Sequence, residues 1–270
     1  MIPNCPGIET FPAGKITHAK YFRHPATYKD KNVLLVGNGP SGADLANQLI
    51  LTTKSIKRSV RSEANPLAIT DPRVRDIGPI KRFNGNTIQL VDGTELTDID
   101  TVIFCTGYLY SLPMFSKEMG FITPDGAYVH HLYDQTFYCE DPTLTFIGLP
   151  KQVLPFPTFQ NQAIVVAKVW AQKLYLPPVA EMRKEELERL ETKVDPKLYH
   201  SFKYPEDVEL AERWRLWIEE DNSPGWEKRM KPWRWTDERK QIRKNATDIK
   251  KAFLKTIEEG RLDHMMLDKA

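Results

Sequence analysis

The spacing of apolar residues changes character along the chain. In the first two thirds, short apolar runs without polar alternation recur, as at residues 33–36 and 101–105. Such runs are typical of strands that are buried on both faces of a parallel sheet. From residue 177 onward, apolar residues stand at helical intervals among charges, and no β-rich run remains. The pattern predicts an α/β fold, with a doubly wound parallel sheet followed by a helical region.

Individual elements follow from the same pattern. The pair Asp92 and Gly93 lies between two short β-prone runs and predicts a tight hairpin. Residues 1–30, rich in Pro, Gly and aromatic side chains, are expected to form an extended lead-in. The expected strands are 33–36, 55–60, 101–105 and 143–148, the hairpin is 86–96, and the expected helices include 40–50 and 163–174.

Residues 31–50 read as a strand, a glycine turn and a helix. The turn fits G-x-G-x-x-G, in which the first Gly permits a tight turn, the second lets backbone approach a pyrophosphate, and the third lets the helix pack closely. The helix N-terminus would then point its free N–H groups at a phosphate. This context predicts a Rossmann-like dinucleotide site, although a structural turn without a ligand is the alternative. The residues expected at the cofactor are Gly37, Asn38, Gly39, Pro40, Ser41 and Gly42.

The end of the second strand indicates which dinucleotide binds. A cofactor without a 2′-phosphate calls for Asp or Glu at this position, about twenty residues past the first glycine. Here stand Arg61 and Ser62, with Arg58 nearby. Because a guanidinium binds phosphate oxygens in a bidentate way, these residues predict NADPH. The alternative is that Arg61 only solvates the strand end, and Glu63 keeps that interpretation open.

Composition narrows the class of protein. The 270 residues carry 38 basic and 36 acidic side chains, and this balance predicts neither nucleic acid nor an anionic membrane as the main partner. No apolar run is long enough to span a membrane, so no transmembrane segment is expected. Cys5, Cys105 and Cys139 are far apart and form no C-x-x-C motif, which indicates neither a disulfide framework nor a metal site. A cytoplasmic setting fits best.

Five tryptophans gather near a helix break at residues 222–225, with cations between them. Such residues could stack on single-stranded nucleic acid. More often they dock helices onto a neighbouring layer while their charges reach water, and this is the interpretation that we adopt. The tryptophans are Trp214, Trp217, Trp226, Trp233 and Trp235.

Several motifs together resemble the flavin-containing monooxygenases of the class B flavoprotein type. Gly14-x-x-x-His18-x-x-x-Phe22 resembles the identifying motif of that family, although Phe11 stands one residue too early. Gly37-x-Gly39-x-Ser41-Gly42 matches the NADPH turn of the family, including the Ser. Taken alone, His18 is more often a structural histidine than a catalytic one.

Two later motifs extend the resemblance. Thr106-Gly107-Tyr108 resembles the T-G-Y motif, where the chain passes between nucleotide domains. Residues 145–163, which include Gln162, resemble the late segment that returns to cover the flavin, and Gln160 stands where an acidic residue is common. The resemblance implies that Thr106, Gly107, Tyr108 and Gln162 contact a cofactor.

The resemblance implies a reaction as well as a fold. NADPH would reduce FAD, O2 would be captured as a C4a-hydroperoxyflavin, and the oxygen would pass to nitrogen or sulfur of a small nucleophilic amine or sulfur substrate. The expected layout is a connection at 1–30, an NADPH-binding domain at 31–105, the C-terminal part of an FAD-binding domain at 106–176, and a helical region at 177–270. No catalytic residue, metal ligand or oligomeric state is assigned.

One expected feature is absent from the sequence. Members of the family begin with their own G-x-G-x-x-G for FAD, and this chain has no glycine fingerprint before Gly37. We therefore interpret it as the C-terminal portion of a monooxygenase. Two alternatives stay open, a non-catalytic NADPH-binding or scaffold protein and a Baeyer–Villiger or N-hydroxylating relative.

Overall fold

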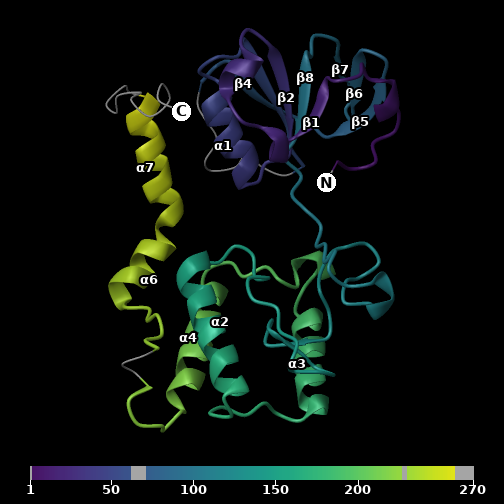
Figure 1. Cartoon of the computed structure of the whole chain (residues 1–270). Helices are drawn as coiled ribbons and strands as arrows, with labels where there is room; N and C mark the ends of the chain where they lie inside the picture. Colours follow the sequence, from purple (N-terminus) through teal and green to yellow (C-terminus); the bar gives the residue numbers. More distant parts are fainter. Residues whose placement is uncertain (1, 62–70, 227–229, 259–270) are drawn as a thin grey trace. The chain divides into compact units, whose positions relative to one another are not determined.

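The computed structural model describes residues 2–61, 71–226 and 230–258. They divide into two compact units, which are described separately (Figure 1). The first comprises the described residues within 1–108 and 247–270, and the second comprises those within 109–246. The predicted regions 106–176 and 177–270 therefore both contribute to the second unit, while residues 106–108 and the described residues from 247 onward belong to the first. Within the described residues, no helix has both the length and the apolar character that crossing a bilayer requires.

The first unit is built on a five-stranded, wholly parallel sheet. Its central strand follows the sequence prediction, because the run from Val33 to Leu35 is fully buried. The expected strands at 55–60 and 101–105 are also confirmed. In spatial order the strands are β1 (Ile16–His18), β8 (Thr101–Phe104), β2 (Asn32–Val36), β3 (Ser55–Ser59) and β4 (Val74–Ile77).

Both faces of this sheet are covered, which explains the unbroken apolar runs. Val33 and Leu35 pack against Leu49 of helix α1 (Pro40–Leu49) on one face. Leu34, between them, packs on the other face with Phe83 of a small antiparallel sheet. That sheet confirms the predicted hairpin and consists of β5 (Ile80–Asn84), β6 (Thr87–Leu90) and β7 (Glu95–Leu96).

The lead-in differs from the prediction of an extended segment. Its strand β1 extends the sheet edge by pairing with β8, and the rest forms short 3-10 turns, η1 (Ile8–Thr10), η2 (Ala19–Tyr21) and η3 (Pro25–Tyr28). The prediction missed β1 because three residues at a sheet edge leave no apolar run to detect. Phe11 is buried edge-on against Phe83, so it anchors the lead-in to the small sheet.

The second unit is mainly helical. It contains α2 (Pro155–Trp170), α3 (Val179–Glu191), α4 (Glu206–Glu219), α6 (Asp237–Lys244), the hairpin β9 (Leu132–Tyr133) and β10 (Phe137–Tyr138), and the turns η4 (Lys117–Met119) and η5 (Pro196–Leu198). Helix α2 packs against α4, and Trp214 of α4 is fully buried between them and the hairpin. The tryptophans of this region therefore dock helices, as predicted. The last helix, α7 (Ala246–Glu258), belongs from residue 247 onward to the first unit, where its Lys250 forms an ion pair with Asp44.

Two predictions for this unit are wrong. Residues 143–148 form no strand and contribute a single bridge, between Phe137 and Thr145. Their apolar residues instead enter a side-chain cluster around Phe146. The helix expected at 163–174 begins eight residues earlier, at Pro155. Pro155 can begin the helix because it lies in the first turn, where its missing N–H costs nothing.

An ion pair with a buried arginine joins strands β3 and β4 and generates a stability prediction. Arg58, whose side chain is 2% exposed, donates to Asp76 through Nε at 2.6 Å and Nη2 at 2.9 Å. We expect Asp76→Asn to destabilise the first unit by roughly 3 kcal/mol, because a buried guanidinium would lose its counter-charge. Urea titration read through hydrogen exchange of the β3 and β4 amides measures this change.

The matched control is the ion pair that the neighbouring residue of β3 forms. Lys57 and Asp98 are joined at 2.9 Å, with the Asp98 side chain 56% exposed. An exposed pair of this kind contributes at most about 1 kcal/mol. Equal losses in Asp76→Asn and Asp98→Asn would contradict the prediction.

Candidate functional site

The candidate site lies at the carboxyl edge of the parallel sheet. Strands β3 and β4 lie on one side of β2, whereas β8 and β1 lie on its other side. The order in which the chain adds strands to the sheet therefore reverses between β2 and β8, and open α/β sheets bind ligands at such a point. The predicted glycine turn follows β2, and the Thr106-Gly107-Tyr108 motif follows β8.

The three glycines of the turn meet different requirements. Gly37 has a φ of 115°, and a Cβ on it would lie 2.8 Å from the carbonyl oxygen of Cys105. A Cβ on Gly42 would lie 2.4 Å from the carbonyl oxygen of Gly37. Gly39 has no atom within 4 Å of its Cβ position. Gly37 and Gly42 are therefore required for packing, while Gly39 leaves open space at the turn.

Helix α1 begins at this open space. Gly39 is its N-cap and makes no side-chain capping bond, and Pro40 occupies the first helical turn. Gly39, Pro40 and Ser41 are exposed, and Asn38 is half-buried. The N–H groups and the positive end of the helix dipole are thus presented to solvent, as an anion site requires.

Arg61 lies two residues past the end of β3 and is exposed. Its charge acts on the Cys5 thiol, lowering a pKa that burial raises. Ser62 and Glu63 lie outside the described residues. Arg58 is not available to the site, because its buried guanidinium is held by Asp76 on β4. Of the two predicted arginines, only Arg61 can reach a ligand.

The structure brings His18 together with the T-G-Y motif. Because β1 and β8 pair in parallel register, His18 lies opposite Phe104, and its Nε2 contacts the carbonyl oxygen of Gly107 at 3.2 Å. The Lys20 N–H donates to Nδ1 at 3.0 Å, so Nε2 carries the proton in the neutral ring. Burial lowers the pKa of His18 and favours this neutral form. His18 therefore positions the segment that follows β8, in line with the structural interpretation.

Tyr108, a predicted cofactor contact, and Cys105 lie near His18 and the end of β8 in the first unit. Tyr108 is exposed, and its ring meets the His18 ring edge-on at 5.2 Å between centroids. Burial raises the pKa of the Cys105 thiol to about 12, so Cys105 serves packing rather than nucleophilic chemistry.

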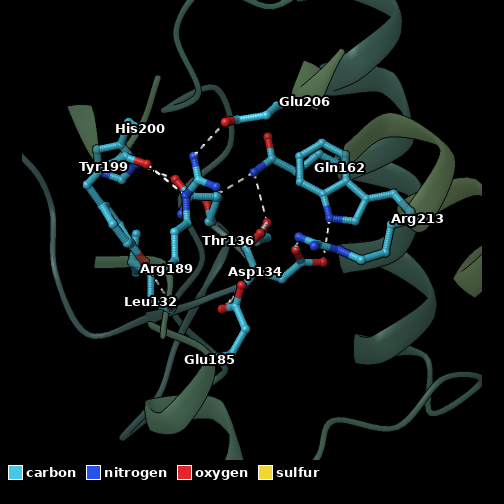
Figure 2. A network of polar contacts seen from close by, with 12 residues as sticks. Leu132, Asp134, Thr136, Gln162, Glu185, Arg189, Tyr199, His200, Glu206 and Arg213 are labelled. Atoms are coloured by element: carbon cyan, nitrogen blue, oxygen red, sulfur yellow. Dashed lines mark hydrogen bonds and ion pairs between the residues drawn. The ribbon is translucent and has the colours of Figure 1, made fainter. Parts of the chain in front are cut away.

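Gln162, the remaining predicted residue, belongs to the second unit and is fully buried. Its Oε1 accepts from the Gly148 N–H at 2.9 Å, and its Nε2 donates to Thr136 Oγ1 at 2.9 Å (Figure 2). Nε2 also contacts the carbonyl oxygens of Gln135 and Phe146. The side chain is thus engaged by protein groups and positions the Gly148 loop, and its predicted contact with a cofactor stays a prediction.

The sequence analysis missed the turn to which Gln162 is bound. Asp134 and Gln135 join β9 to β10 with φ of 49° and 62°, a conformation that hairpins usually reserve for Asn and Gly. Asp134 accepts from Trp214 Nε1 at 2.6 Å and pairs with Arg213 (Figure 2). No local motif marks this turn, because its partners lie between 27 and 80 residues away in sequence.

His200 completes the network around this turn. Its Nε2 accepts from the Val129 N–H at 3.0 Å, so its Nδ1 donates to Gln135 Oε1 at 2.6 Å. Burial lowers the pKa of His200 to about 3, and the ring is neutral at physiological pH. His200 therefore has a fixed tautomer and does not change its protonation state near neutrality.

Comparison with known proteins agrees with this geometry. The flavin-binding monooxygenase-like family model matches residues 2–78 and 56–207. A flavin-containing monooxygenase of Aspergillus flavus is 30% identical over 231 residues, covering 74% of this chain and 47% of that protein. A trimethylamine monooxygenase of Methylocella silvestris is 34% identical over 203 residues, covering 72% of this chain and 44% of that protein. The chain thus spans about half the length of these curated relatives.

Solved structures show the same fold. The S-allyl-L-cysteine S-oxygenase of Allium sativum matches 100% of this chain and 62% of its own with a TM-score of 0.73 at 22% identity. Tmm from Pelagibacter matches 83% of this chain and 50% of its own with a TM-score of 0.66 at 25% identity. With the family model covering most of its length, this chain belongs to the flavin-binding monooxygenase-like family.

Proposed function

We propose that this chain provides the NADPH-binding part of a flavin-dependent monooxygenase that oxidises nitrogen or sulfur in small molecules. The observation that carries the proposal is the open space at Gly39, between two glycines that packing requires. Relatives named trimethylamine monooxygenase and thiol-specific monooxygenase support nitrogen and sulfur as the atoms oxidised. In such a reaction the hydride comes from NADPH, and the oxygen atom comes from O2 by way of the flavin.

The residues of the first unit fit the nicotinamide dinucleotide. In this proposal the N–H groups at the start of α1 bind the pyrophosphate, and Gly39 lets the phosphates approach the backbone. Arg61 binds the 2′-phosphate. His18 holds Gly107 at the end of β8 and so shapes the crevice next to β2.

The residues of this chain do not make a complete FAD site. A second dinucleotide pyrophosphate needs its own strand, glycine turn and helix N-terminus. The sequence contains one G-x-G-x-x-G, at Gly37 to Gly42, and the proposal assigns it to NADPH. This single fingerprint favours a second candidate function, a non-catalytic NADPH-binding protein.

The first prediction for the nucleotide site concerns the 2′-phosphate. Arg61→Ala should weaken NADPH binding about ten- to a hundredfold, because a charge-assisted hydrogen bond to phosphate contributes roughly 1.5–3 kcal/mol. NADH binding should change little. Arg75→Ala removes the same charge from an exposed position on β4 and serves as the control in calorimetric titrations. NADPH affinity that is unchanged in Arg61→Ala would exclude this role.

The second prediction separates the two kinds of glycine. Gly39→Val should abolish NADPH binding while the fold persists, because its Cβ has no protein atom within 4 Å and the side chain would occupy the space of the pyrophosphate. Gly42→Val should instead unfold the first unit, since its Cβ would lie 2.4 Å from backbone. Circular dichroism and NADPH titration on the same samples measure both. Binding retained by a folded Gly39→Val protein would mean that the turn is purely structural.

The third prediction distinguishes the enzyme portion from the non-catalytic protein. The chain alone should bind NADPH, purify without flavin and show no NADPH oxidation with added FAD. Supplying the FAD-binding half of a relative in trans should restore oxidation if the chain is a monooxygenase portion, and should not if it is non-catalytic. Absorbance spectra and NADPH consumption provide the readouts. A yellow protein that oxidises NADPH unaided would overturn the assignment of the glycine turn.

A further inference from the structure

The second unit contains a cavity that the proposed function does not use. Its volume is about 530 Å³, within the range of small-molecule sites. It lies between the second turn of α2, the segment that precedes α6, and α6 itself. Its lining includes Gln160, Trp226, Lys231, Trp233, Arg234 and Arg239.

The charge of this cavity is positive. Arg234 pairs with Glu219, but neither Lys231 nor Arg239 has a carboxylate partner in the part of the chain that the structure describes. Asp237 and Glu238, in the first turn of α6, are not among the lining residues. Among the described residues, these two exposed cations of the wall have no carboxylate partner, and an anion would supply a counter-charge.

The positive groups are held in place by neutral ones. The Arg239 guanidinium lies 4.1 Å from the Trp233 ring centroid and donates to the carbonyl oxygen of Arg234 at 2.8 Å. Gln160 Nε2 donates to the carbonyl oxygen of Lys231 at 2.9 Å, which ties this segment to α2. A guanidinium is planar, and stacking on an indole fixes the orientation of that plane. Its remaining N–H groups are then directed to bind a carboxylate.

The rest of the wall is aromatic. Trp226 and Trp233 line it and are half-buried, and Lys168 already lies 3.9 Å from the Trp226 ring centroid. A bare inorganic anion would leave this surface and most of the volume unused. A planar ring that carries an acid group would use the indoles, the stacked guanidinium and the cations together.

We propose that this cavity binds a small aromatic carboxylate, with its acid group between Lys231 and Arg239 and its ring against the Trp233 side of the wall. The site lies wholly within the second unit and does not depend on the nucleotide site. It gives Gln160 a role in specificity, because a carboxylate at this position would repel the ligand whereas the neutral amide does not.

Calorimetric titration of the full chain with 2-naphthoate tests the site. Two further probes separate its parts, since 2-naphthamide lacks the charge and inorganic phosphate lacks the ring. We expect 2-naphthoate to bind at least about tenfold more tightly than either, the ratio that one charge-assisted contact or one stacked ring supplies. Equal binding of 2-naphthoate and 2-naphthamide would overturn the proposal.

Variants identify where the probe binds. Lys231→Ala, Arg239→Ala and Gln160→Glu should each weaken 2-naphthoate binding about tenfold or more. Lys244→Ala, which removes an exposed charge from the last turn of α6, should change it less than twofold. Circular dichroism checks the fold of each variant, and Arg239→Lys provides a milder substitution if Arg239→Ala misfolds.

Independence from the nucleotide site is tested with the same probe. Binding of 2-naphthoate should persist in Gly39→Val and in the presence of saturating NADPH. Displacement by NADPH would show that the cavity belongs to the nucleotide site and would overturn the proposal. Gly39→Val is expected to lose NADPH and to keep 2-naphthoate. NADPH that stays bound would contradict the NADPH assignment, whereas loss of 2-naphthoate from the folded variant would contradict this site, so the two failures give different results.

Discussion

The first unit depends on a backbone contact that leaves no room for side chains. The carbonyl oxygen of Cys105 lies beside Gly37, and the carbonyl oxygen of Gly37 lies beside Gly42, each closer than a Cβ atom allows. This contact holds the ends of β2 and β8 and the start of α1 together at the point where the sheet order reverses. The helix N-terminus and the motif after β8 therefore meet at one crevice. Gly39 takes no part in that packing, and the open space at this position is the observation on which the proposed nucleotide site rests.

The second unit is held by a different constraint, the hydrogen bonding of buried polar groups around one hairpin turn. Its hairpin turn places Asp134 and Gln135 in a conformation that non-glycine residues rarely adopt. The turn persists because Trp214, His200 and Gln162 hydrogen-bond to it from three separate segments. Each of these groups would be left unpaired in the interior if its partner were lost, which is more costly than the net gain of the bond. The Gly148 loop inherits its position from this network through Gln162.

Residues of one type, close in sequence, serve packing in one case and remain available to a ligand in the other. Arg58 and Arg61 are three residues apart, yet Arg58 is neutralised by Asp76 inside the sheet, whereas Arg61 faces solvent past the end of the strand. Trp214 and Trp233 likewise belong to one tryptophan-rich region, yet Trp214 is buried in the core and Trp233 carries Arg239 on its ring beside a cavity. Residue type alone does not separate these roles, because burial and counter-charge decide them.

The sequence by itself determined β2, α1, β3, β8 and the hairpin at Asp92 and Gly93, because periodicity and turn chemistry act over a few neighbouring residues. It also located the glycine turn and Arg61, which follow from position along one strand and one helix. Only the tertiary structure decided that β1 joins the sheet, that residues 143–148 form no strand, and that His18 reaches Gly107. It likewise decided the pairing of Arg58 with Asp76 and of Gln162 with Gly148. These features depend on contacts between distant segments, for which the local pattern of apolar and polar residues contains no signal.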